Sequence, residues 1–323
     1  MDTFEDVVLT TRIRLARNVS GYNFPNNMIK KQKEEIVKLI KDKLKDKYTI
    51  LDLDNIDDIT KMSLVETHTI SKELVQSSGS ALIIDEKNNI TTMINEEDHF
   101  RMQVFENNFN LEEAYNKIKA FDSTVAKSIK YAYDEDYGYI TACPTCIGTG
   151  MRVSVMLHLP ALEKIGFLER IFNEITNLGI SVRGIYGENT SGYGCIYQIS
   201  NQKTLGIKEK DIIEQVRQAT NYVVKQERKA REIIKNRIEI KDEIFRSYGI
   251  LKNAIIMSKK EAFELISNIR MGINMEIIND IKLENIDKLI ENIGKNTLKK
   301  NFKEDFSKEQ ENIKRAEYIK NNI

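Results

Sequence analysis

The chain has 323 residues, with 49 basic and 49 acidic side chains and therefore a formal net charge of zero. This length exceeds the ~100–200 residues typical of one domain, so we expect two domains. Balanced charge provides no global field that would recruit nucleic acid or a membrane surface. Any anion site must therefore come from a local cluster of arginines.

The sequence predicts a cytoplasmic protein. It has no continuous apolar run of the ~18 residues that suggests a membrane span. Its start, Met1 to Asp6, has neither the basic segment nor the apolar core of a signal peptide. The three cysteines, Cys143, Cys146 and Cys195, are too few, and odd in number, for a secreted disulfide framework.

The first two thirds of the chain mix strand and helix patterns. Arg12 and Arg14 alternate with apolar residues along an extended segment, so both guanidinium groups should project from one face. Residues 81–95 have the signature of a β-hairpin with a polar turn at 85–89. Further strands are predicted at 138–142, 153–158, 180–185 and 195–200, and helices at 111–130 and 162–178. Hairpins with helices on one side predict an α+β fold whose sheet is mainly antiparallel and flanked by helices.

After Leu205 the glycine loops and strand-like runs disappear, and helical patterns replace them. A long helix is predicted over 209–234, and Ser258 to Glu261 has the spacing of a capping box ahead of an amphipathic run. We therefore expect an α+β domain over residues 1–232 and a helical C-terminal domain over 233–323. For roughly the last twenty residues, a partly disordered charged tail is the alternative.

Four short stretches hold most of the residues that could do chemistry, and each lies at a predicted strand end or loop, where sites are usually built. They are TTRIRLARN (10–18), NEEDHFR (95–101), CPTCIGTGMR (143–152) and RGIYGENTSGYG (183–194). Their arginines, if they converge, would bind a polyphosphate, because guanidinium groups are always charged and bidentate. The alternative is a set of unrelated surface ion pairs.

Several nucleotide and metal sites are excluded or disfavoured. The chain has no G-x-x-x-x-G-K-[ST] loop, which excludes a P-loop nucleotide site. It also has neither an H-R-D-type catalytic loop nor a D-F-G motif, so it does not resemble the protein kinases that carry them. Cys143 and Cys146 could form a redox pair, half a zinc site, or a reactive thiol with a passive neighbour. Zinc is disfavoured because a structural site needs four ligands and no second C-x-x-C or paired histidines are present. No metal site is predicted.

Taken together and in this order, the motifs resemble the phosphagen (guanidino) kinase family. NEEDHFR, CPT.IGTG.R, and RG..GE followed by IYQISN carry the resemblance. TTRIRLARN, MLHLPAL and YGILKNA are similar to the bacterial protein-arginine kinases of the McsB type. The resemblance covers nearly the whole chain. It implies a phosphagen-kinase-like catalytic domain followed by an α-helical C-terminal domain.

The resemblance also implies roles for individual residues. Glu97 would bind the acceptor guanidinium and act as the catalytic base. Glu188 would be the second carboxylate on that group, and Cys143 would contact it as a thiolate. The ATP phosphates would be bound by the five motif arginines, Arg12, Arg14, Arg101, Arg152 and Arg183. ATP and Mg²⁺ are the expected cofactors.

The function implied is an ATP-dependent protein-arginine kinase that marks proteins for regulation or degradation in the bacterial stress response. Kinases of free arginine or creatine carry a helical domain ahead of the arginine pair, whereas Arg12 lies almost at the start here, which predicts an open cleft. The alternatives are a kinase for a small guanidino compound and a kinase-like adaptor without activity. Expected partners are proteins with accessible arginines, an activator of the McsA type, a Clp-type unfoldase and a second copy in a homodimer.

Two positions depart from the family pattern. Cys146 occupies a position where asparagine is usual, so it could act as a resolving cysteine for Cys143 or point away as a passive substitute. The R-D-x-x-R-A pattern, tied in the McsB type to phosphoarginine binding, retains only Arg315 and Ala316 in the run from Glu311 to Ala316.

Overall fold

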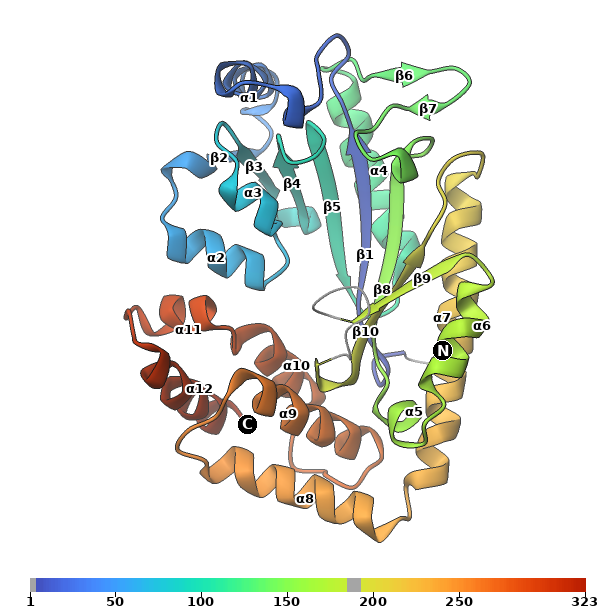
Figure 1. Cartoon of the computed structure of the whole chain (residues 1–323), viewed down its shortest axis with the longest axis vertical. Helices are drawn as coiled ribbons and strands as arrows, with labels where there is room; N and C mark the ends of the chain where they lie inside the picture. The colour runs from blue at the N-terminus through green and yellow to red at the C-terminus, as the bar shows by residue number, and fades with distance from the viewer. Residues whose placement is uncertain (1–3, 185–192) are drawn as a thin grey trace.

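The structure is a computed structural model that describes residues 4–184 and 193–323. Its centre is an eight-stranded sheet in the order β2-β3-β4-β5-β1-β8-β10-β9, in which every neighbouring pair is antiparallel (Figure 1). The predicted α+β fold with a mainly antiparallel sheet is therefore confirmed. The strands are β1 (Val8–Arg17), β2 (Thr49–Asp52), β3 (Ala81–Asp85), β4 (Ile90–Ile94), β5 (Phe100–Asn107), β8 (Met151–His158), β9 (Ile180–Gly184) and β10 (Ile196–Asn201).

The central strand β1 shows why the sheet has two different faces. Ile13 and Leu15 are fully buried and belong to the main hydrophobic core, whereas Arg12 and Arg14 are only partly buried. Successive side chains of a strand point to opposite faces. One face of the sheet therefore packs on the core, and the other presents the two arginines, as predicted.

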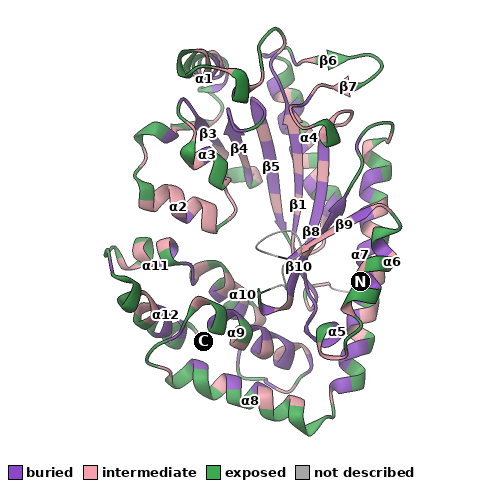
Figure 2. Cartoon of the chain, viewed as in Figure 1, coloured by how far each residue is buried: buried purple, intermediate pink, exposed green. Residues whose placement is uncertain are grey.

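Helices cover the core face of the sheet. Helix α4 (Leu111–Ala126) packs on β1 and β5, and α7 (Glu209–Ile234) packs on β8 and β10. The residues that α4 buries include Leu111, Ala114, Ile118, Phe121 and Val125, at the 3- and 4-residue spacing of one helical face. Figure 2 shows the middle strands and the inner faces of these helices as the most buried part of the molecule.

Most of the predicted elements are present. The hairpin forms as β3 and β4 joined by a short helical turn over Glu86–Asn88. The 138–142 strand prediction is wrong in extent, because only β7 (Gly138–Tyr139) forms, and it pairs with β6 (Tyr133–Asp134) outside the main sheet. The 162–178 helix prediction is also wrong. The chain forms α5 (Pro160–Lys164) and α6 (Leu168–Thr176), separated at Gly166, whose φ of +73° ends the first helix.

Residues between β1 and β3 also form helices that were not predicted from the sequence. Helix α1 (Lys30–Leu44) packs into the main core through Ile36, Val37, Ile40 and Leu44. Two shorter helices, α2 (Asp58–Glu66) and α3 (Lys72–Gln76), lie beside the outer strands β3 and β4. Helices α2 and α3, together with β2, form a small lobe next to the arginine-bearing face of the sheet.

The rest of the chain is helical. It contains α8 (Ile238–Asn253), α9 (Lys259–Asn274), α10 (Leu283–Asn292), α11 (Lys295–Phe302) and α12 (Lys308–Asn322). The capping box predicted before α9 is present, because the Glu261 amide donates to Ser258 Oγ at 3.2 Å and the Ser258 amide to Glu261 Oε2 at 3.4 Å. In α12, Arg315 is fully buried and donates to the carbonyls of Ile293 and Met257, both at 3.0 Å. Its guanidinium therefore supports packing within the helical region.

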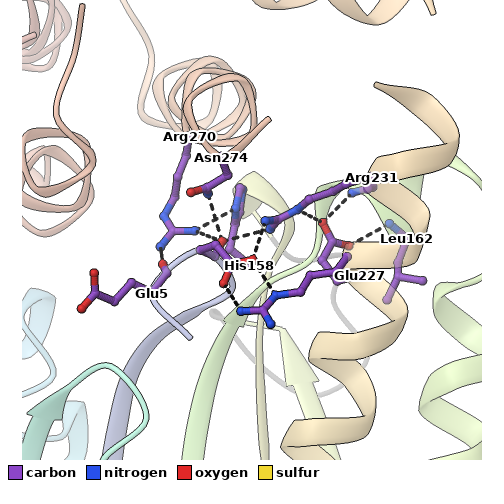
Figure 3. Close-up of polar contacts among 10 residues, drawn as sticks. Glu5, His158, Leu162, Glu227, Arg231, Arg270 and Asn274 are labelled. Carbon is purple, nitrogen blue, oxygen red and sulfur yellow. Dashed lines mark hydrogen bonds and ion pairs between the residues drawn. The ribbon is translucent and has the colours of Figure 1, made fainter. Parts of the chain in front are cut away.

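A buried polar network joins the helical region to the sheet (Figure 3). Arg270 of α9 donates to the carbonyl oxygens of Glu5 at 2.7 Å and Asp6 at 2.8 Å, and to His158 Nδ1 at 3.3 Å. Arg231 of α7 pairs with the Asp6 carboxylate at 3.0 Å. Burial, and then the charges of Arg270 and Arg231, hold the pKa of His158 well below its usual value, so this histidine is neutral. None of the described helices combines the length and hydrophobicity that a membrane span requires.

Candidate active site

The acidic loop, residues 95–99, connects β4 to β5, and the cysteine loop, residues 140–150, connects β7 to β8. Both emerge beside the end of β1, because Arg17 pairs with Phe100 and Leu15 pairs with Met151. Asp98 joins them directly, since its Oδ1 accepts from the Asn18 side chain at 2.6 Å and from the Ala142 amide at 2.7 Å. The sheet register and one carboxylate thus bring the two sequence motifs together.

The three carboxylates of the acidic loop have different environments. Glu96 and Asp98 are 8% and 5% exposed, whereas Glu97 between them is exposed. Glu96 accepts from the Glu97 amide at 3.0 Å and forms an ion pair with Arg101. The two buried acids therefore fix the loop, and Glu97 is the one exposed carboxylate of the three.

Burial and neighbouring charges separate the pKa values of these acids. Burial, followed by the charges of Asp98 and Glu96, raises the pKa of Glu97. Burial, the largest effect on Glu96, would raise its pKa, but the Arg101 charge together with hydrogen bonds from the Glu97 amide, Ser71 and Arg101 outweighs it, and the pKa is lowered. Glu96 is thus ionised as the partner of Arg101, and Glu97 is the more basic carboxylate of the pair.

The five motif arginines lie on four strands. Arg12 and Arg14 are on β1, Arg101 is on β5, Arg152 is on β8 and Arg183 is on β9. Arg14 is the direct cross-strand partner of Arg152. Arg183 pairs with Gln198 of β10, whose side-chain oxygen accepts from Arg12 at 2.8 Å. The sheet therefore assembles one row of guanidinium groups from motifs up to 171 residues apart (183 − 12).

Ordinary partners hold Arg12 in place. Besides Gln198, it donates to Ser154 Oγ at 3.4 Å, and its guanidinium carbon lies 5.6 Å from the centre of the Phe105 ring. Burial, followed by the charges of Arg101 and Arg152, lowers the pKa of Arg12 to about 10. It stays protonated at neutral pH, in a setting that a bound anion would make more favourable.

A cavity of about 1160 Å³ lies along this face of the sheet, and Arg12, Arg14, Arg101 and Arg183 are among its lining residues. The opposite wall belongs to the helical region and includes Lys259, Phe263, Lys282 and Lys288. His68, Phe105 and Met156 contribute the aromatic and apolar part of the lining. A cavity of this size, with cations on both walls and aromatic and apolar groups in its lining, fits a nucleotide in size and in chemistry.

In the cysteine loop, a helical turn over Pro144–Cys146 brings the two thiols together. The Cys146 amide donates to the Cys143 carbonyl at 3.0 Å, and Cys143 Sγ lies 3.0 Å from Thr145 Oγ1. Burial, followed by the proximity of Cys143, raises the pKa of Cys146, while the Arg152 charge opposes that rise. Cys146 is therefore mainly a neutral thiol next to Cys143 and the arginine row.

Not every predicted site residue can be placed. Glu188 lies outside the described residues. Conversely, the sequence reasoning did not single out Asn18, Asp98, Ser154, Gln198 or His68, which position the loops and arginines or line the cavity. Asp98 was visible as part of N-E-E-D, but its bond to Ala142 depends on tertiary structure. Within residues 4–184 and 193–323, no group of three or more His, Cys, Asp or Glu side chains is arranged to hold a metal ion.

Comparisons with known proteins show the family and the fold of the chain. Residues 27–230 match the family described as ATP:guanido phosphotransferase, C-terminal catalytic domain. Residues 237–323 match the family described as Protein-arginine kinase McsB C-terminal domain. The chain resembles the duplicated taurocyamine kinase of Schistosoma mansoni with a TM-score of 0.65 and 24% identity, over 76% of this chain and 38% of that one. This likeness supports the fold.

Two curated relatives match nearly end to end. The chain is 43% identical to the protein-arginine kinase of Clostridium acetobutylicum over 98% of its own length and 96% of the relative. It is 40% identical to the protein-arginine kinase of Clostridium novyi over 99% of its own length and 95% of the relative. The chain therefore belongs to the ATP:guanido phosphotransferase family, within its protein-arginine kinase branch, and is a phosphotransferase.

Proposed function

We propose that this protein transfers the γ-phosphoryl group of ATP to arginine side chains of other proteins. The observation that carries the proposal is a cavity of about 1160 Å³ lined by four motif arginines, with the acidic and cysteine loops meeting beside them. Phosphoryl transfer needs mainly positioning and charge neutralisation, which a row of guanidinium groups supplies.

The proposed roles follow from charge and position. Arg12, Arg14, Arg101, Arg152 and Arg183 bind the phosphates, and Arg101 is released in part from Glu96 to do so. Mg²⁺ enters with ATP as part of the substrate, held mainly by phosphate oxygens, as is usual for this ion. The five arginines on the sheet then neutralise further negative charge of the phosphates.

The acceptor guanidinium needs the other half of the site. Its pKa is above ~12, so its nitrogen is a poor nucleophile until a carboxylate orients it and accepts a proton. We propose Glu97 as that base, supported by its exposure and its raised pKa. We propose that Glu188 is the second carboxylate and that Cys143 contacts the same group.

The choice of a protein acceptor is supported by the relatives that carry the name protein-arginine kinase and by the match of the helical region to the McsB C-terminal domain. The runner-up is phosphorylation of a small guanidino compound.

We propose a domain boundary between residues 232 and 233. The match to the catalytic-domain family ends before this boundary, at residue 230, and the match to the McsB C-terminal domain begins after it, at residue 237. A cytoplasmic location, a stress-response role, a homodimer, an McsA-type activator and a Clp-type unfoldase remain predictions.

The test is incubation with Mg²⁺-ATP and an arginine-rich protein, followed by mass spectrometry under non-acidic conditions. The expected product is phosphoarginine on the protein, with little or no turnover of free arginine. Efficient turnover of free arginine with none on protein would overturn the proposed acceptor. Absence of both would favour an adaptor without activity.

A further inference from the structure

One carboxylate connects the small lobe to the helical region. Glu66 ends α2, and its Oε1 accepts from the Asn296 amide at 3.1 Å and from Asn296 Nδ2 at 2.9 Å. Its Oε2 accepts from the Thr297 amide at 2.8 Å and from Thr297 Oγ1 at 2.9 Å. A single side chain therefore receives four hydrogen bonds from the first turn of α11.

The contact replaces the cap that α11 lacks. The first amides of a helix have no partner inside the helix, and a negative charge at that end is stabilised by the helix dipole. The N-cap position of α11 is Gly294, which has no side chain to bond these amides. Glu66, 228 residues away in sequence (294 − 66), does so from another part of the molecule. We call this the Glu66 contact.

The two segments also fit closely. A Cβ added at Gly294 would lie 2.8 Å from Glu66 Cδ and closer still to Oε2. Its φ of −66° and ψ of 149° are open to any residue, so glycine is required here for space and not for backbone conformation. Any side chain at this position would displace the Glu66 carboxylate from the amides of α11.

The Glu66 contact lies at the cavity. Glu66, Thr67 and His68 line it from the small lobe, and Ile290 and Gly294 line it from the helical region. The helical region is attached to the sheet a second time through Arg270 and its partners in Figure 3. The wall formed by α9 and α10 is thus held on both sides of the cavity.

His68 links the same segment to the arginine row. Its φ of +58° is unusual for a residue other than glycine, and such strain is found where surrounding structure imposes it. Gln103 of β5 imposes it here, because its Nε2 donates to the Thr69 carbonyl at 2.7 Å and to the His68 carbonyl at 3.3 Å. Glu66 therefore lies two residues from a cavity residue whose backbone carbonyl is hydrogen-bonded to the sheet.

We propose that Glu66 is a positioning residue whose contact with α11 holds the helical wall over the nucleotide, so that nucleotide binding and this contact favour each other. The inference rests on the proposed function for the identity of the ligand. A nucleotide between the arginines and α10 touches both walls only while the contact is made. Lys259, Lys282 and Lys288, with Glu284 and Glu291 among them, then face its phosphates and ribose.

Coupling between two binding events is reciprocal, so two effects can be measured: that of the nucleotide on the Glu66 contact, and that of the Glu66 contact on nucleotide affinity. Binding of Mg²⁺ with a non-hydrolysable ATP analogue should slow hydrogen exchange of the Asn296 and Thr297 amides, whose bonds to Glu66 are the only ones described for them. Glu66→Ala should speed the same exchange without nucleotide and weaken analogue binding on the order of tenfold. The KM for ATP should rise more than kcat falls.

The matched control is Asp58→Ala, which removes an exposed carboxylate from the first turn of the same helix. It should change neither exchange in α11 nor nucleotide affinity. Gly294→Ala should reproduce the effect of Glu66→Ala by steric clash while keeping the carboxylate. In the double variant the clash partner is absent, so adding Gly294→Ala to Glu66→Ala should have almost no further effect.

The outcomes separate this inference from the proposed function. Faster exchange in Glu66→Ala with unchanged analogue affinity would mean that the contact is structural only and would overturn the coupling. Unchanged exchange would overturn the contact itself. If the wild-type protein did not bind the analogue at all, the proposed function would fail, while the nucleotide-free exchange experiment would still test the contact.

Discussion

Arg14 and Arg152 face each other directly across β1 and β8. Neither guanidinium makes a hydrogen bond or ion pair with another residue in the described parts of the chain. Burial lowers the pKa of both, and for Arg14 the charges of Arg12, Arg101 and Arg152 follow in order of effect. Like charges placed opposite each other destabilise a sheet. The protein without ligand therefore stores unfavourable charge that a polyphosphate would neutralise.

Arg152→Gln should separate stability from function. Without nucleotide we expect unchanged or slightly higher stability, by up to about 1 kcal/mol, because one of two opposed charges is removed. The rise in Tm that Mg²⁺-ATP gives the wild type should be largely lost. Thermal unfolding with and without nucleotide measures both. The control Arg170→Gln, in the exposed pair with Glu174, should retain the nucleotide effect. A full nucleotide effect in Arg152→Gln would remove Arg152 from the phosphate site.

Glu97→Gln should lower the rate of phosphoryl transfer on the order of 10²- to 10⁴-fold, because it removes the proposed base and keeps its shape. ATP binding should remain close to that of the wild type. Initial rates of ADP release avoid acid treatment of the product. Near-normal turnover would falsify the assignment of Glu97 as the base.

The pH profile provides a second test of the same residue. A base acts only when deprotonated, so activity is lost as pH falls through its pKa. Because burial and the charges of Asp98 and Glu96 raise the pKa of Glu97, this loss should occur above the ordinary glutamate value of 4.5. Asp98→Asn removes one like charge and can still accept the Ala142 amide, so it should move the acid limb to lower pH. A shift in the opposite direction would contradict this origin of the raised pKa.

Arg17→Met should destabilise the fold by about 3–5 kcal/mol, because it removes the bidentate partner of the buried Asp122 carboxylate, which keeps only the more distant Lys119 ammonium at 3.7 Å. Arg17 donates to Asp122 at 3.0 and 3.2 Å, and their side chains are 0% and 5% exposed. Urea unfolding followed by far-UV circular dichroism measures the change. Arg170→Met, in an exposed pair, should change stability by less than ~1 kcal/mol. Equal effects in the two variants would show that burial is not the cause.

Peroxide should inactivate the enzyme through a disulfide between Cys143 and Cys146. The turn that joins them places their Cα atoms within the ~7 Å that a disulfide requires. Two thiols and one hydrogen peroxide give one disulfide and two waters, with Cys143 oxidised first and Cys146 displacing the hydroxide. Peptide mapping should recover the linked peptide, and dithiothreitol should restore activity.

The control for that experiment is Cys146→Asn. Without a second thiol, oxidised Cys143 should proceed to acids that dithiothreitol does not reduce. Inactivation that is as fast and as reversible in this variant as in the wild type would mean that Cys146 has no part in it.

Features that depend on local pattern were predictable from the sequence. Alternation placed Arg12 and Arg14 on one face, the polar turn between β3 and β4 marked a hairpin, and the spacing of Ser258 and Glu261 gave a capping box. The break between α5 and α6 was missed, because apolar residues keep helical spacing across Gly166 even though its positive φ ends the helix. Periodicity reports which side is buried and not whether the backbone is continuous.

Features that depend on register or on distant segments were not predictable. Nothing near Arg12 in the sequence indicates Gln198, and nothing near Glu66 indicates α11. The prediction of a strand over 138–142 was wrong for a similar reason, since β7 pairs with β6 instead of joining the main sheet. Site motifs could be recognised one by one, but the residues that orient them become apparent only when strands from separate parts of the chain are neighbours.

The position of β1 in the sheet has a consequence for how the protein folds. Among the eight strands of the sheet it is synthesised first, yet it lies between β5 and β8, whose paired residues follow it by up to 149 positions (157 − 8). Contacts of such separation form slowly, because a long loop must close before they contribute. On the ribosome, both edges of β1 stay unpaired until β5 emerges, and the edge that faces β8 stays unpaired until β8 follows. Unpaired strand edges of this kind promote aggregation. The arrangement that gathers the arginines thus makes folding of the nascent chain depend on protection of its first strand.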